Sequence, residues 1–448
     1  MNKKIFHIFI CTIYYFLQDF CKKSIPPIAE IIAAISASYS SHISVAYIFN
    51  HLQNNISAYY KIIQRKNFDY FNIYRRILLF VLQFLSKSNS YFYLCLDDTF
   101  SPRFSKKAPN CQIIYKKGKY LLSQVRIIIS AIISINDNKT ISLPVLVKLV
   151  AKVENSNKLD DALEMIKLIH NWINEKFSKK IILLTDAWYM RGKLLIDVVG
   201  EYGITVIGRV RKDTVLHFPV AEFGLKKRGR PRIYGEKISK NYIKNLPVKK
   251  VKLFLYSKLR EVEYKSVIGY PRFLKGKIKC RCVYVRIKDL KQKDFALIIC
   301  TNPNLKEEEI IKSYAKRWKI ETMFRELKQI FGFNEIWQQK EETVNKMTSI
   351  VMASYSITSI LSYFATIKKM KVKDIICYRK DNNFTVGLMK VFLIKILGRF
   401  NVRKEMKKIY KQKIDFEGEI WGYFTRLPHG LYTIICNILM INVFLNYT

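Results

Sequence analysis

Four residues that can bind cations or phosphates recur at helical spacing in one segment of the chain. They are Tyr314, Arg317, Glu321 and Lys328. At about 100° per residue in an α-helix, their side chains fall within roughly a 60° arc. A carboxylate held among cations suits a metal ion and a phosphate group, because charges on a solvated helix surface are usually spread around its polar side. The alternative is an ordinary amphipathic helix with i, i+4 pairs such as Arg317 and Glu321.

An apolar face lies directly beside this polar stripe on the same helix. It consists of Ile320, Met323, Phe324, Leu327, Ile330 and Phe331. The stripe therefore borders a protein core. Glu326 is a second acid in the segment, but it falls near 120° on the helical wheel, far from the stripe. Glu321 is therefore the expected functional carboxylate.

The spacing of the four residues resembles the Y-R-E-K signature of DDE transposases from bacterial insertion sequences, whose catalytic core has an RNase H-like fold. The resemblance predicts two aspartates upstream, each at the end of a strand. Residues 91–99 and residues 180–188 are apolar runs that end in acid, and they supply Asp98 and Asp186. The long interval between Asp186 and Glu321 matches family members that carry a β-rich insertion. The resemblance extends over residues 85–340.

The same resemblance implies that Asp98, Asp186 and Glu321 hold two Mg²⁺ ions, for which Mn²⁺ can substitute. Mg²⁺ prefers oxygen ligands, and two such ions can activate an attacking hydroxyl and stabilise a leaving oxygen. Neighbouring strand residues face opposite sides, so periodicity leaves the choice between Asp97 and Asp98 open. The family pattern places the ligand directly before Thr, which favours Asp98.

Further roles follow from the resemblance. Tyr314, Arg317 and Lys328 would grip phosphates of the transferred DNA end. The protein would bind element ends, cleave a strand and join it to target DNA, with double-stranded DNA as partner and a homodimer in the synaptic complex. Two alternatives remain: a catalytically inactive relic that acts as an inhibitor, and a host RNase H-like nuclease. The intact acids and signature argue against the relic, and the β-rich insertion against the nuclease.

Composition agrees with a nucleic-acid partner. The 448 residues include 78 Lys plus Arg against 35 Asp plus Glu, a net charge of +43, and such an excess attracts polyanions. An AT-rich genome, which inflates Lys, would account for part of it. The nine cysteines form no C-x-x-C pair, so neither zinc nor a disulfide framework is indicated. We expect a reduced bacterial cytoplasm, in association with the nucleoid.

The pattern of apolar runs and turns predicts an α/β protein with an RNase H-like mixed-sheet core, interrupted by a β-rich insertion and flanked by helical regions. Between residues 91 and 210 the order reads β-β-β-α-β-α-β. The expected segments are a helical DNA-binding region 1–88, core parts 89–210 and 304–370, a basic insertion 211–303 and a helical region 371–448. Within the first, residues 44–66 could form a helix-turn-helix or part of any small helical bundle.

The insertion contains a basic loop, residues 226–232, with a Gly-Arg-Pro core like that of an AT-hook. Its cations are Arg228, Arg230 and Arg232, together with two lysines. Extended backbone flanked by Arg fits a narrow minor groove, but a solvated loop that contacts only phosphates is the simpler interpretation. Some family members stack a flipped base on a Trp in the insertion, and here none occurs between Trp188 and Trp318. An aromatic such as Tyr234, Phe254 or Tyr256 would have to replace it.

Three apolar stretches could be mistaken for membrane segments. They are Ile5–Leu17, Met347–Ile367 and Leu431–Tyr447. The first is too short to span a bilayer and is followed by no small-residue cleavage site. The second contains many Ser and Thr residues, and the third contains three Asn residues. We expect all three to be packing helices, with no membrane insertion.

Overall fold

The computed structural model describes most of the chain. The described residues are 2–38, 56–86, 91–105, 107–116, 118–136, 139–151, 155–220, 232–290, 294–368, 370, 384–397 and 401–412. The chain divides into two compact units. The helical unit comprises Met1–Tyr39, Val45–Phe68 and Ala353–Thr448, and the sheet unit comprises Ser40–Ser44 and Asp69–Met352.

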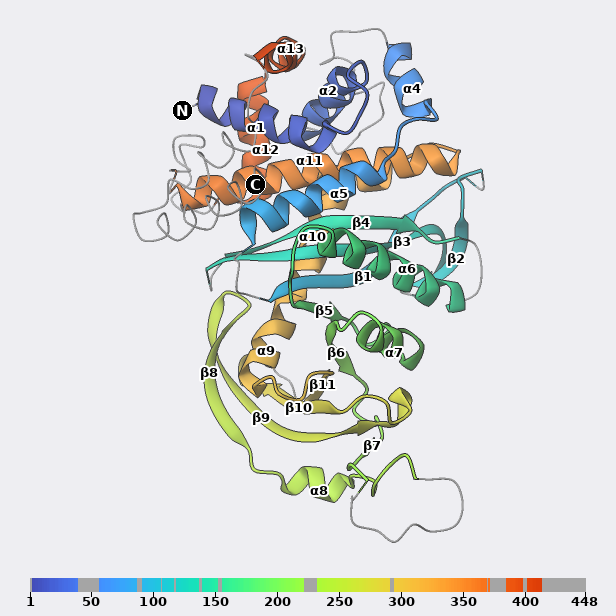
Figure 1. Ribbon diagram of the computed structural model, residues 1–448, viewed down its shortest axis with the longest axis vertical. Coiled ribbons are helices and arrows are strands. Elements are labelled where there is room, and N and C mark those ends of the chain that lie inside the picture. The colour runs from blue at the N-terminus through green and yellow to red at the C-terminus, as the bar shows by residue number, and fades with distance from the viewer. Residues whose placement is uncertain are drawn as a thin grey trace, which may run out of the picture. The chain divides into compact units, whose positions relative to one another are not determined.

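The sheet unit is built around five strands in the order β4-β3-β1-β5-β6 (Figure 1). Their bounds are β1 Phe92–Pro102, β3 Lys119–Asn136, β4 Lys139–Leu149, β5 Ile181–Thr185 and β6 Thr205–Val210. The first three pair antiparallel, whereas β5 pairs parallel with both β1 and β6. The crossovers to β5 and β6 contain α6 (Asn155–Asn174) and α7 (Gly192–Gly200). This topology confirms the predicted RNase H-like mixed sheet.

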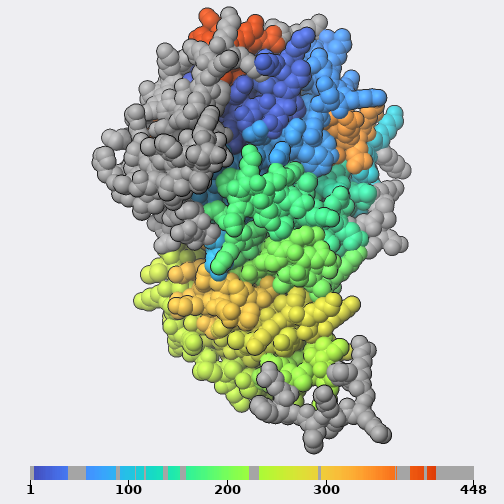
Figure 2. Space-filling view, in the orientation of Figure 1, coloured from blue at the N-terminus to red at the C-terminus, as the bar shows by residue number. Residues whose placement is uncertain are grey.

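The strands of the predicted insertion extend the same sheet, which has 11 strands in the described residues. The added strands are β7 Leu216–His217, β8 Lys249–Leu255, β9 Lys258–Pro271, β10 Cys280–Ile287 and β11 Ala296–Cys300, and β2 (Cys111–Lys116) pairs with β3. β11 joins them to the core by pairing antiparallel with β6. In the space-filling view this yellow-green to yellow segment lies directly against the green surface of the core (Figure 2).

A close backbone approach joins α7 to the insertion. The turn η3 (Arg272–Leu274) packs against α7, and a Cβ atom at Gly192 would come within 2.1 Å of the Phe273 carbonyl oxygen. Only glycine fits there without moving the backbone. Two further short elements of the insertion are α8 (Lys240–Asn245), capped by Ser239, and η4 (Lys288–Leu290).

Helices cover the core strands. α5 (Phe71–Phe80), continued by the π-helical turn η2 (Val81–Leu85), packs on β4, and α10 (Trp318–Ile330) packs on β1 and β4. α9 (Glu307–Lys316) packs on β6, β8 and β11. Three glutamates in the first turn of α9 complement its helix dipole. Gly332, with φ of 66°, ends α10 in the left-handed region that suits glycine, and η5 (Phe333–Glu335) follows.

The helical unit is organised around a buried acid. Its helices are α1 Asn2–Leu17, α2 Ile25–Ser36, α4 Ile56–Gln64, α12 Val386–Leu397 and α13 Val402–Gln412, together with the end of α11 (Glu341–Ile367). Glu30 accepts a hydrogen bond from the Tyr59 hydroxyl at 2.7 Å and pairs with Arg403 at 2.8 Å. These contacts tie α2 to α4 and α13.

The expected apolar helices near residues 5–17 and 347–367 are present as α1 and α11. Within the described residues, α11 is long and apolar enough to cross a membrane, but 89% of its most apolar window is buried in the protein. Several of its hydroxyls donate hydrogen bonds within the protein. Thr348 and Thr358 donate to carbonyls four residues earlier, and Ser354 donates to the Ile32 carbonyl. α11 therefore has the burial of a core helix.

Other expectations fall outside the described residues. These are the stretch 431–447, the first part of the possible helix-turn-helix, and the basic loop 226–232 except Arg232, which is exposed. The functional boundaries of the five predicted segments remain predictions. Two details of the first strands differ from expectation: β2 adds a strand to the predicted order, and β1 continues past the acids to Pro102, because residues 97–102 still pair with β3. The first acids thus lie inside a strand, whereas Asp186 directly follows β5.

Candidate active site

The two parallel strands β1 and β5 bring their acidic residues to one place. Their pairing ends at Leu96 and Thr185, so Asp97 and Asp186 are the next residue on each strand. The Asp186 carboxylate accepts the backbone N–H groups of Trp188 at 3.0 Å and Tyr189 at 3.3 Å. These two bonds fix the turn after β5 and the orientation of the carboxylate.

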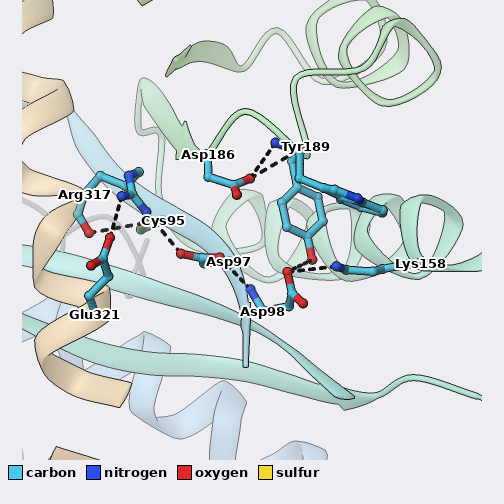
Figure 3. A network of polar contacts seen from close by, with 9 residues as sticks. Cys95, Asp97, Asp98, Lys158, Asp186, Tyr189, Arg317 and Glu321 are labelled. Atoms are coloured by element: carbon cyan, nitrogen blue, oxygen red, sulfur yellow. Dashed lines mark hydrogen bonds and ion pairs between the residues drawn. The ribbon is translucent and has the colours of Figure 1, made fainter. Parts of the chain in front are cut away.

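Asp97 and Asp98 point to opposite faces of the sheet (Figure 3). Asp97 shares its face with Tyr93 and Cys95, whose side chains reach Ser313 and the Arg317 carbonyl. That face is covered by α9 and α10. Asp98 instead forms an ion pair with Lys158 of α6, at 2.8 Å. The structure therefore brings Asp97 to the signature helix, and it does not bring Asp98 there.

Arg317 connects the acids of the strand and the helix. Its Nη1 donates to Asp97 Oδ2 at 3.1 Å, and its Nη2 donates to Glu321 Oε1 at 2.6 Å (Figure 3). The side chains of Asp97 and Arg317 are each 14% exposed, and that of Glu321 is 35% exposed. Two carboxylates from distant parts of the chain thus share one guanidinium group.

The signature residues lie on two helices, which corrects the expectation of a single continuous helix. The chain turns at Arg317, between α9 and α10, where Arg317 N–H donates to the Tyr314 carbonyl three residues earlier. The Arg317 guanidinium lies 5.8 Å from the Tyr314 ring centre. Lys328 is half-buried, two turns beyond Glu321, or about 10 Å along the axis. The apolar face is buried at Ile320, Met323, Leu327 and Phe331, whereas Phe324 and Ile330 are half-buried.

Burial and the charges of the site shift the pKa values of Asp97 and Arg317. Burial, followed by the negative charge of Asp186, raises the pKa of Asp97 from 3.8 to about 7, although Arg317 opposes the shift. Burial by itself lowers the pKa of Arg317, but the surrounding groups, with Tyr314 and Cys95 foremost, raise it overall. The site therefore keeps Arg317 positively charged, whereas the ionised form of Asp97 is disfavoured by burial and by repulsion from Asp186.

The donor chemistry of Asp97, Asp186 and Glu321 suits a hard divalent cation, because all three offer carboxylate oxygens. The raised pKa of Asp97 is a second indication that the site suits a cation, because a bound cation would offset the repulsion between Asp97 and Asp186. Among the described residues, no three His, Cys, Asp or Glu side chains are grouped closely enough to hold an ion in their present positions. Arg317, which contacts Asp97 and Glu321, provides the neutralising charge.

A basic cleft of about 720 Å³ lies next to the signature helices. Five cations and two acids line it: Lys306, Lys312, Lys316, Lys319 and Arg325, with Glu308 and Glu309. Trp318, which is 52% exposed, and Phe254 and Tyr256 from the tip of the β8–β9 hairpin add aromatic surface. Of the aromatic residues considered for base stacking, Phe254 and Tyr256 thus face this cleft. Tyr234 lies elsewhere, with its hydroxyl bonded to the Arg272 carbonyl.

The hairpin tip that carries Tyr256 has an uncommon backbone. Tyr256 and Ser257 have φ values of 53° and 65°, a region that non-glycine residues seldom adopt. Burial raises the pKa of Tyr256, and the charges of Arg317 and Arg260 counter the shift. Two-residue hairpin loops of the type I′ kind require positive φ at both positions, so the turn itself accounts for these values.

Sequence reasoning missed three residues of the site: Lys158, Trp188 and Tyr189. Tyr189 is fully buried and its hydroxyl lies 3.5 Å from Asp98, while the Lys158 ammonium lies 3.8 Å from the Trp188 ring centre. The pair Trp188–Tyr189 directly follows Asp186 and could have been considered. Lys158 gave no signal, because only the fold brings α6 to β1.

Residues 94–357 match the sequence family described as a transposase DDE domain. No curated protein matches the chain. Among solved structures, the NurA nuclease from Sulfolobus solfataricus aligns with 59% of this chain and 86% of its own, at 12% sequence identity and a TM-score of 0.23. That TM-score is too low to support an argument about fold or function.

Proposed function

Since its matched region makes this chain a member of the transposase DDE domain family, we propose that it binds the ends of an insertion sequence, cleaves a strand there and joins the freed end to target DNA. Family membership itself carries transposase function and DNA binding. The steps at the element ends are the proposal, and they rest on one observation: Arg317 joins the Asp97 and Glu321 carboxylates, next to Asp186.

We assign the metal-holding role to Asp97, Asp186 and Glu321. Asp97 replaces Asp98 in this set because Asp98 faces α6 and is paired with Lys158. Two Mg²⁺ ions, with Mn²⁺ able to substitute, would lower the pKa of the attacking hydroxyl and stabilise the leaving oxygen. The fixed turn after β5 orients Asp186, and the pairing of β1 with β3 orients Asp97, so little rearrangement is needed at those two residues.

Arg317 and the basic cleft would hold the DNA. A phosphate oxygen can take the place of a carboxylate as acceptor for the Arg317 guanidinium, which presents several donors in one plane. The Tyr314 ring centre lies 5.8 Å from this guanidinium, and Lys328 lies farther along α10. The cleft next to these residues combines five cations with aromatic surface, a combination that suits phosphates and unstacked bases. Joining two element ends would require two copies of the protein, so a homodimer is the proposed active form.

The test is strand cleavage on DNA that carries the inverted repeats flanking the coding region. The variants D97N, D186N and E321Q remove one charge each and preserve side-chain shape. Each should reduce Mg²⁺-dependent cleavage to background while binding of the same DNA changes little. D98N, which removes none of the assigned ligands, should keep cleavage above background.

Three results would contradict the proposal. Cleavage by D97N equal to that of the wild type, together with background cleavage by D98N, would return the ligand role to Asp98. Binding without cleavage by the wild type would indicate an inactive inhibitor. Cleavage of random DNA as readily as of the repeats would indicate a general nuclease.

A further inference from the structure

A second polar cluster lies on the opposite face of β1 from Arg317. Asp98 is its centre, with a side chain that is 10% exposed, and Lys158 pairs with it at 2.8 Å. The Tyr189 hydroxyl donates to the same Asp98 oxygen at 3.5 Å (Figure 3). The other oxygen, Oδ2, is buried and accepts no hydrogen bond from the described residues. The cluster joins β1, α6 and the turn after β5.

The same turn carries Asp186. Its first residue, Asp186, accepts the backbone N–H groups of Trp188 and Tyr189. Its last two residues contact side chains of other elements. The Lys158 ammonium lies 3.8 Å from the Trp188 ring centre, and Asp98 accepts a hydrogen bond from the Tyr189 hydroxyl. A change at Lys158 or Asp98 therefore acts on the backbone groups that orient the Asp186 carboxylate.

We propose that Asp98, Lys158 and Tyr189 are positioning residues that fix the Asp186 turn for cation binding, and that Asp98 is not itself a metal ligand. The inference rests on the proposed function. Its physical basis is mutual restraint: the ion pair holds Lys158 over Trp188, and the rigid strand holds Asp98 under Tyr189. Loosening either contact frees Asp186 to turn away from Asp97.

The two roles for Asp98 predict opposite effects of K158M. If Asp98 were a ligand, removing the lysine would free its carboxylate and remove a nearby positive charge, so cations would bind more tightly. If Lys158 positions the turn, K158M weakens cation binding, by about 10-fold on the scale typical for residues that orient metal ligands. Y189F changes no charge and should weaken binding several-fold for the same reason.

The measurement is isothermal titration calorimetry of Mn²⁺ into the full-length protein without DNA. K158R, which keeps both the ion pair and the cation over Trp188, should bind like the wild type. K193M is the matched control, because Lys193 forms an exposed pair with Asp160 at 2.5 Å on the same helices, α6 and α7. It should leave Mn²⁺ affinity unchanged. Circular dichroism and the melting temperature establish that each variant is folded.

Weaker Mn²⁺ binding by both K158M and Y189F, with K158R and K193M unchanged, supports the positioning role. Tighter binding by K158M, or unchanged binding by both variants, overturns it. D97N and E321Q separate this result from the proposed function, because they should lose Mn²⁺ binding in either case. If they retain wild-type affinity, the assignment of the metal site fails instead.

Discussion

The Asp97 carboxyl gives the most direct test of the site, because its burial has a cost that depends on pH. Its pKa is 3.8 in a freely solvated chain and about 7 in the folded protein. Well below pH 4 the group is neutral in both states and costs nothing. As pH rises from about 4 to 7, the unfolded chain ionises first and the folded state loses stability relative to it. The shift of about 3 units corresponds to about 4 kcal/mol above pH 7.

Replacing Asp97 with Asn removes this cost. Relative to the wild type, D97N should gain up to about 4 kcal/mol of unfolding free energy at pH 8, roughly half of that near pH 5.5, and only about 0.5 kcal/mol near pH 4. Urea unfolding in EDTA at these three pH values, followed by Trp fluorescence, measures the difference. Four of the five Trp residues lie within residues 69–352, so the signal reports mainly on the sheet unit.

D98N is the matched control for this experiment. The substitution removes the charged partner of Lys158, whose side chain is only 14% exposed. The D98N variant should therefore be less stable than the wild type at pH 8. The reasoning would be refuted if D97N were destabilised at pH 8, or if its difference from the wild type did not change between pH 4 and pH 8. Either result would mean that burial and the charge of Asp186 do not disfavour the ionised Asp97 carboxylate.

Three further predictions follow from the same geometry. Mn²⁺ at about 100 times its Kd should stabilise the wild type at pH 8 by about 2.7 kcal/mol and D97N by much less, which thermal melts with and without the ion would reveal. R317A and K328A should each flatten the log–log salt dependence of duplex binding by roughly 0.9 if the residue contacts a phosphate; an unchanged slope would assign it to helix packing. Changing the three arginines of the basic loop 226–232 to Ser should lower affinity for element ends and random DNA by similar factors, because phosphate contacts do not read sequence; a selective loss on A·T-rich ends in parallel titrations would identify an AT-hook.

The sequence by itself predicted the five core strands of the sheet unit and the helical position of Glu321, although it missed β2. Apolar runs of four to eight residues and the 3.6-residue period are local properties, so the strands carrying Asp97 and Asp186 and the helix carrying Glu321 could be predicted. The spacing of Tyr314, Arg317, Glu321 and Lys328 also indicated the family. The same spacing could not show the break between α9 and α10. The break involves no departure from helical dihedral angles, since Arg317 has a φ of −52° and a ψ of −36°.

Only the tertiary structure showed which of the two neighbouring aspartates meets the signature helix. Strand alternation requires Asp97 and Asp98 to face apart, but which face meets the signature helix depends on packing between segments 220 residues apart. The same holds for Lys158, which α6 brings to Asp98, and for Tyr256, which a hairpin tip brings to the basic cleft. Such contacts are fixed by how whole elements pack, and no local pattern in the chain encodes them.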